Sequence, residues 1–123
     1  MSDSHIKKSK KITKNWGYEL IIENNENYCG KILHFETKAK FSMHFHMLKH
    51  ETWYVQSGKF IYRWIDTQNA EQHEREISQG DVIVIKPGHP HQLEALEKGD
   101  IFEVSTKHYD SDSYRVGKGD SQK

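Results

Sequence analysis

The chain has 123 residues and a formal net charge of zero, which fits one domain and gives no electrostatic reason for nucleic-acid binding. Its only cysteine, Cys29, excludes a disulfide within the chain, and no apolar run approaches the length of a membrane span. The composition therefore predicts a soluble protein of a reducing compartment, the cytoplasm, that contacts neither nucleic acid nor membrane.

The chain begins with a basic segment and continues as a series of short strand-like stretches. Residues 1–14 hold five lysines, one aspartate and no aromatic residue, which is typical of a solvated, flexible tail. Runs of β-formers then occupy residues 16–23, 28–36, 41–47, 51–57, 59–65, 80–85, 91–96 and 101–106. A polar stretch at 66–74 indicates a loop, and 116–123 a second flexible tail. This spacing predicts one all-β sandwich or barrel over residues 15–115.

The stretch "HFHMLKHE" places chemically active side chains on one strand face. Residues two apart in a strand share a face, so His44 and His46 point the same way. Glu51 opens the next strand, and His91 begins a strand farther along the chain. Imidazoles combined with a carboxylate suit a transition metal and leave positions for water or substrate.

Chance remains the competing explanation for any single histidine pair, since the chain has nine histidines. We expect five of them to be surface or loop residues rather than ligands: His5, His34, His50, His73 and His108. The ordered spacing of the other residues is what favours a metal site.

That spacing resembles the two motifs of the cupin superfamily over about residues 38–95. The first motif is matched at His44, His46, Glu51 and Gly58, with Lys38 standing in place of its first glycine. The second motif is matched at Gly80, Gly88 and His91, with Lys86 and Ala95 in place of its proline and asparagine.

The cupin resemblance implies a single-domain antiparallel jelly-roll barrel with a metal inside its mouth. The implied ligands are His44, His46, Glu51 and His91. The implied cofactor is one divalent transition metal, either zinc, manganese, iron, cobalt or nickel.

A narrower resemblance is to the stand-alone relatives of the type II mannose-6-phosphate isomerase cupin domain. It rests on Trp16-Gly17, on the segment from Glu51 to Gly58, on Ile101, Glu103 and Val104, and on "DSDSYR" ending at Arg115. It implies an aldose–ketose isomerase that moves a proton between two carbons of a sugar phosphate.

Several residues are candidates for each role in such a reaction. The base is Glu51, Glu103 or His89, and the phosphate is bound by Lys49, Arg63 or Arg115. Alternative functions are an iron-dependent dioxygenase, another sugar or sugar-nucleotide enzyme, and a non-catalytic metal- or sugar-binding module. The resembling cupins are commonly dimers, and the alternating apolar residues of 16–23 suit packing against a second subunit.

Overall fold

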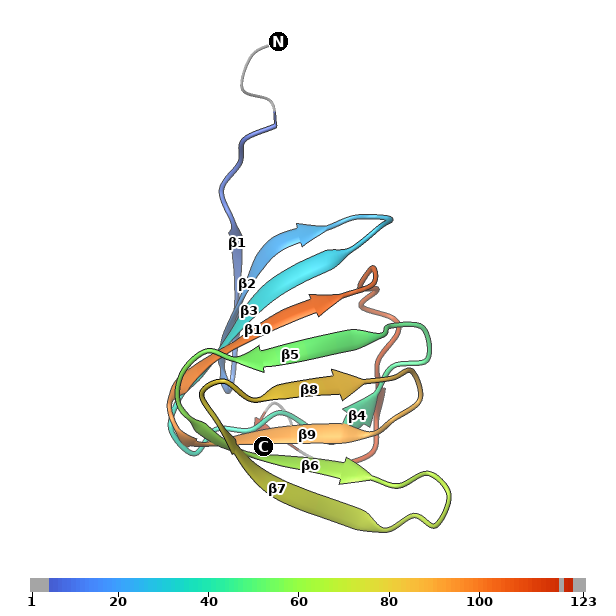
Figure 1. Cartoon of the computed structure of the whole chain (residues 1–123). Coiled ribbons are helices and arrows are strands. Elements are labelled where there is room, and N and C mark those ends of the chain that lie inside the picture. Colours follow the sequence, from blue (N-terminus) through green and yellow to red (C-terminus); the bar gives the residue numbers. More distant parts are fainter. Residues whose placement is uncertain (1–4, 118, 121–123) are drawn as a thin grey trace.

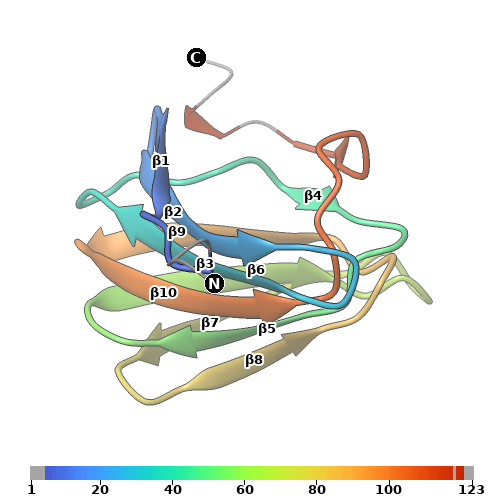
Figure 2. The ribbon, with the colours of Figure 1, turned by 90° about the horizontal axis from the view of Figure 1, so that it is seen from above.

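The computed structural model describes residues 5–117 and 119–120, and the regular elements of this part of the chain are all β-strands. Two antiparallel sheets face each other (Figures 1 and 2). The six-stranded sheet has the order β1 (Lys10–Lys14), β2 (Gly17–Asn24), β3 (Cys29–Phe35), β10 (Gly99–Ser105), β5 (Glu51–Val55) and β8 (Val82–Ile85). The five-stranded sheet has the order β11 (Tyr114–Arg115), β4 (His44–Phe45), β9 (His91–Glu97), β6 (Lys59–Ile65) and β7 (Gln72–Ser78). The predicted all-β architecture is confirmed.

The core fills the space between the sheets and follows from the alternation within each strand. Every second residue of β3 is buried, because successive side chains point to opposite faces of a sheet. Both sheets contribute fully buried side chains, such as Phe35 and Trp53 from one and Phe60 from the other. The Phe35 and Phe60 rings meet edge to face with their centroids 5.6 Å apart, which joins the two sheets.

Polar inward-facing residues gather at one end of the barrel. Glu51 is the first residue of β5 and His91 the first of β9, and both are buried. Their strands continue with apolar inward residues, so the other end of the interior is hydrophobic. The functional side chains are therefore held at the end of a rigid, packed core.

Two backbone positions explain why the motif spacing matters. Gly58 has a φ of 88°, and a Cβ there would lie 2.8 Å from the Cα of Gly99, so no other residue fits without a shift. Lys38 has a φ of 68°, in the left-handed region that a glycine would adopt at this motif position. The lysine changes the residue type at this turn but keeps the glycine-like conformation.

The strand boundaries differ from the sequence prediction in three places. Lys10–Lys14, predicted as part of a flexible tail, form β1 and pair with β2. The predicted loop 66–74 ends early, because Gln72–Ser78 form β7, an edge strand whose only buried residue is Ile77. In the second predicted tail, the N–H groups of Val116 and Gly117 both donate to the Met43 carbonyl.

Residues 1–4, 118 and 121–123 of the two predicted tails lie outside the described residues. Within the described part of the chain, no helix has the length and apolar character needed to cross a membrane.

Candidate metal centre and its cavity

Three histidines converge between the sheets. His44 lies in β4, His46 follows that strand directly, and His91 opens β9, where it is the register partner of His44. One ring nitrogen of each lies within 4.8 Å of those of the other two. Sequence reasoning predicted these three residues as ligands, and the fold brings them together.

Each of these rings is oriented by a backbone carbonyl. The distances to Nδ1 are 2.7 Å from Ser42 O for His44, 2.6 Å from Asp112 O for His46, and 2.9 Å from His89 O for His91. A carbonyl oxygen can only accept a hydrogen bond, so each Nδ1 carries the proton and each Nε2 keeps a free lone pair. Metal-binding histidines are held by the same kind of outer contact.

Glu51 completes the cluster. Its Oε2 lies 3.4 Å from His46 Nε2 and 3.8 Å from His91 Nε2, while its Oε1 accepts a 2.7 Å hydrogen bond from Trp53 Nε1. Ligand atoms bound about 2.1 Å from one metal lie roughly 3 Å apart, close to these separations. Glu51 Oε2 and His91 Nε2 are buried without a hydrogen-bond partner among the described residues. A divalent metal bound between these two atoms would give each of them a partner.

Burial keeps the histidines in the form that binds metals. It lowers the pKa of His44 and of His91, and with the nearby Lys49 ammonium it lowers the pKa of His46 to about 4. All three rings are therefore neutral near pH 7. Burial and the charge of Glu103 raise the pKa of the Glu51 carboxyl above its usual range. A bound cation would lower this pKa and so favour the ionised carboxylate.

A buried polar group beside the cluster centres on Lys49. Its Nζ lies 3.1 Å from Glu103 Oε2, 3.9 Å from Glu51 Oε2 and 3.2 Å from His108 Nδ1. Burial would raise the pKa of Glu103, but the ammonium groups of Lys49 and Lys31 hold it below its usual range. Glu103 is thus an ionised carboxylate, and Lys49 links it to Glu51 of the histidine cluster.

The cluster opens onto a cavity of about 1000 Å³, large enough for a sugar-sized ligand. Three of the four predicted ligands line it: His44, His46 and Glu51. Its charged lining residues are Lys10, Lys14, Lys31, Lys49, Arg115, Glu19, Glu51, Glu103 and Asp110. Lys14 and Lys31 both pair with Glu19, whereas Lys10 and Arg115 form no ion pair within the described residues. Two cations are therefore available at this cavity.

The sequence of the chain matches a known protein family. The family model described as "Cupin" matches residues 8–115. The chain belongs to the cupin family. The predicted single-domain cupin jelly-roll is confirmed, with two antiparallel sheets around the histidine cluster.

Solved structures share the fold of this cupin. The capsular polysaccharide assembling protein CapF of Staphylococcus aureus matches with a TM-score of 0.76 and 19% identity, over 95% of this chain and 35% of that one. Oxalate decarboxylase of Bacillus subtilis matches with a TM-score of 0.75 and 18% identity, over 88% of this chain and 30% of that one. The Lactobacillus farciminis oxalate decarboxylase, in a formate complex, matches with a TM-score of 0.77 and 16% identity, over 88% and 34%.

The cupin chain spans about a third of the length of these structures, and the identities show a shared fold alone. The Bacillus subtilis oxalate decarboxylase has Mn(II) centres. No curated protein matches the chain in sequence.

The predicted phosphate-binding residues separate into different environments. Arg115 lines the cavity of this cupin and is the register partner of His44. Lys49 also lines it but is buried against Glu103. Arg63 does not line it: its guanidinium binds Glu94 at 2.8 Å and Glu74 at 3.3 Å. Arg63 is therefore a partner in ion pairs between neighbouring strands, outside this cavity.

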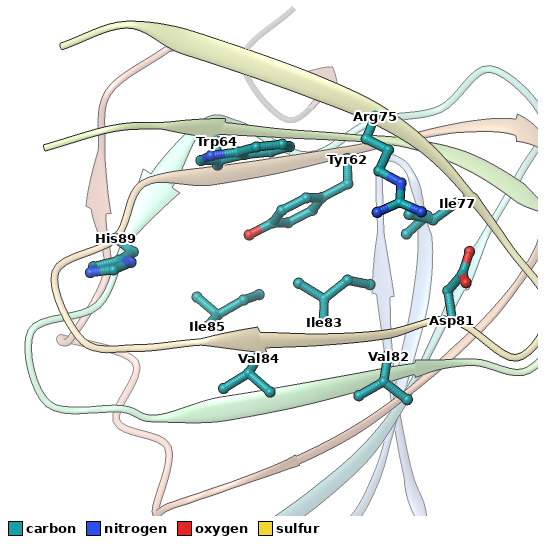
Figure 3. A pocket seen from close by; sticks show the side chains of 10 residues that line it. All are labelled: Tyr62, Trp64, Arg75, Ile77, Asp81, Val82, Ile83, Val84, Ile85 and His89. Carbon is teal, nitrogen blue, oxygen red and sulfur yellow. The ribbon is translucent and has the colours of Figure 1, made fainter. Parts of the chain in front are cut away.

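His89, predicted as a possible base, belongs to a second cavity of about 410 Å³ (Figure 3). This cavity lies between β8 and the strands β6 and β7. Ile83 and Ile85 point into it from one side and Tyr62 from the other (Figure 3). His89 stands at its rim, and its contact with the histidine cluster is through its carbonyl oxygen, which accepts the Nδ1–H of His91.

Sequence reasoning missed two residues beside the cluster. His108 was expected to be a surface or loop residue, and it does lie in the loop after β10, but its ring lines the cavity next to Lys49. Asp112 received no role, yet it is buried and its carbonyl orients His46. Neither belongs to a cupin motif, and only the path of the chain after β10 brings them to the site.

Proposed function

We propose that this cupin is a metal-dependent aldose–ketose isomerase acting on a sugar phosphate, with the mannose/fructose 6-phosphate pair as first candidate. The observation that carries the proposal is the combination of a His–Glu cluster with a cavity whose wall also holds cations that form no ion pair among the described residues. A phosphate at Arg115 and a sugar carbonyl at the cluster would place one ligand across this cavity.

The side chains present suit proton transfer along a sugar. A bound divalent metal would supply Lewis acidity towards the substrate carbonyl and its neighbouring hydroxyl. Arg115 would bind the phosphate, because a guanidinium matches phosphate oxygens in a bidentate way. The predicted bases that line this cavity are Glu51 and Glu103, and Glu103 is the ionised one, although the ammonium groups that lower its pKa also weaken it as a base. Lys49 would hold its carboxylate in place.

The proposed ligands are His44, His46, Glu51 and His91. Three imidazoles and one carboxylate accept zinc, manganese, iron, cobalt or nickel. Manganese is the first metal to test, because a fold relative, the Bacillus subtilis oxalate decarboxylase, has Mn(II) centres.

The test is incubation of metal-loaded protein with hexose and pentose phosphates in deuterated water, followed by NMR. We expect interconversion of an aldose and a ketose phosphate, with solvent deuterium entering the carbon next to the carbonyl. Chelation should abolish both. If no sugar phosphate exchanges a proton with solvent when the protein is loaded with any of the five metals, the isomerase proposal fails. A measurement of oxygen consumption then distinguishes a dioxygenase from a binding module.

We also propose that the protein is a homodimer through the outer face of its larger sheet. An apolar row crosses this face through the register partners Leu20, Ile32, Phe102, Tyr54 and Val82. Tyr54 is 44% exposed and Val82 60% exposed, a large apolar surface to leave in water. Light scattering should give a dimer mass at micromolar concentration and a monomer for Val82→Asp. A monomeric wild type would contradict this proposal.

A cytoplasmic location is the remaining proposal about cellular context. Cys29 is the chain's only cysteine and it is buried. Burial raises the pKa of its thiol, so the group stays protonated and unreactive. A fluorescent fusion followed by fractionation tests the location.

A further inference from the structure

Asp112 is the most unusual polar residue outside the cupin motifs. It is 4% exposed, and its carboxylate has no ion pair among the described residues. Instead it accepts backbone hydrogen bonds from three consecutive residues, Met47 at 2.8 Å, Leu48 at 3.1 Å and Lys49 at 3.1 Å. All three N–H groups converge on this one carboxylate. Asp112 therefore fixes the turn between His46 and Glu51.

The main chain of the same residue reaches the metal cluster itself. The Asp112 carbonyl accepts the Nδ1–H of His46 at 2.6 Å. The side chain thus holds the turn that follows His46, and the carbonyl holds the His46 ring. Asp112 therefore fixes both the orientation of the His46 ring and the path of the turn after it, and together these decide where Nε2 of His46 points.

The segment around Asp112 is anchored along β4. The N–H of Val116 donates to the Met43 carbonyl at 2.7 Å, and the Tyr114 ring stacks on Phe45 with centroids 5.2 Å apart. Strand β4 therefore lies between β9 and β11 of the C-terminal segment. Without that segment, the two-residue strand carrying His44 would pair on one side only.

We propose that Asp112 is a positioning residue for the metal centre: it aligns His46 and Glu51 so that their free atoms point at one site. The inference rests on the metal site proposed above. Other histidines of the cluster are oriented by carbonyls two residues away in sequence, Ser42 for His44 and His89 for His91. Only His46 depends on a distant residue, so its alignment requires the C-terminal segment in place.

The test compares Asp112→Asn with Asp66→Asn. An asparagine turns one carboxylate oxygen into an NH₂ donor facing backbone donors, which opens the turn while leaving the side-chain size unchanged. Asp66 is the matched control, because its carboxylate accepts the Gln68 N–H at 2.9 Å in a turn outside the metal cavity. Metal affinity is measured by competition with a chromophoric chelator, and ligand geometry by the absorption spectrum of the cobalt-loaded protein.

We expect Asp112→Asn to weaken metal binding by roughly 10-fold or more, the usual effect of losing an outer contact to a ligand, and to change the cobalt spectrum. Asp66→Asn should leave both unchanged. If Asp112→Asn lowers only the melting temperature of the metal-free protein and keeps wild-type affinity and spectrum, the inference is overturned. Failure of the wild type to bind any metal would overturn the metal site itself.

A measurement on the wild type keeps the inference testable if Asp112→Asn does not fold. Metal binding fixes His46 and, through it, Asp112. Hydrogen exchange at the amides of Met47, Leu48 and Lys49 should therefore slow by several-fold when metal is added, relative to the Gln68 amide. Equal exchange with and without saturating metal would contradict the coupling.

Discussion

Replacing Glu51 by glutamine should change stability in opposite directions with and without metal. Glu51 and Glu103 are both buried, and the single ammonium of Lys49 lies 3.9 Å from one carboxylate and 3.1 Å from the other. With the histidines neutral, the metal-free site therefore has one uncompensated negative charge when both carboxyls are ionised. Glu51 Oε2 has no hydrogen-bond partner among the described residues, so the charge is also poorly solvated.

An uncharged amide of the same shape removes this charge and can keep the hydrogen bond from Trp53 to Oε1. Leaving a buried polar group unsatisfied costs about 1–3 kcal/mol, more for a charged group. Metal-free Glu51→Gln should therefore be more stable than the wild type by about 1–3 kcal/mol at alkaline pH, or roughly 3–10 °C in melting temperature. The metal-dependent rise in melting temperature should shrink, because an amide oxygen is a weaker ligand than a carboxylate.

The pH dependence follows from the direction of the shift. Burial raises the folded-state pKa of Glu51 above its unfolded value, so protonation of Glu51 stabilises the metal-free fold. That contribution is present in acid and is lost as pH rises through the folded-state pKa. The advantage of the glutamine variant should be small at about pH 5 and largest at about pH 9.

Thermal unfolding with chelator and with excess metal, at both pH values, measures these effects. Glu94→Gln serves as the control, because Glu94 pairs with Arg63 outside the cavity. If Glu51→Gln is less stable than the wild type without metal at both pH values, Glu51 is mainly an ion-pair partner of Lys49. The metal-centred reasoning would then be wrong.

Four further outcomes are expected. His46→Ala and His91→Ala should each lower metal content sharply while the wild type retains one metal per chain, as elemental analysis would show; full occupancy in either would contradict the assignment. Metal-free Glu51→Gln, which lacks the opposing titration of Glu51, should lose about 3 kcal/mol or more of unfolding free energy as pH falls from 6.5 to 4, because the folded-state pKa of His46 is lowered to about 4 and its stabilising contribution is fully present only above the unfolded value; flat denaturation midpoints of this variant across the range would refute it. Arg115→Ala should raise KM for phosphorylated sugars far more than for free sugars, whereas Arg63→Ala should not. Lys38→Gly should raise the melting temperature or leave it unchanged. Glycine removes the strain of a lysine in the left-handed region, about 1 kcal/mol, but it also raises the entropy of the unfolded chain, and the two effects oppose each other. A clear fall in melting temperature would show that the lysine side chain stabilises the fold.

The central strands and the shared face of the clustered side chains were predictable because local patterns decide both. Two-residue alternation places His44 and His46 on one face, and Glu51 shares its face with Trp53 and Val55, two residues buried in the core. The same regularity predicted eight strand-like stretches, each of which overlaps a strand of the structure.

The missed features depend on contacts between distant segments. Strand β1 is mostly polar and, among the described strands, pairs with β2 alone, and β7 lies at a sheet edge with both faces largely exposed. Such edge strands lack the alternating apolar pattern on which the prediction relied. Asp112 and His108 reach the cluster through the fold of the C-terminal segment, 66 and 59 residues away from His46 and Lys49.

Stability and function oppose each other at the polar end of the barrel. Two buried carboxylates share one buried ammonium there, an arrangement that costs folding free energy in the metal-free protein. With a divalent ion bound, the buried charge at this end becomes positive by one unit. A positive site in a low-dielectric interior favours an anionic ligand or an anion that develops during reaction. The carboxylate surplus that weakens the empty barrel is therefore what would recruit the metal, and the metal in turn would suit the cavity to a phosphorylated or enolate-forming substrate.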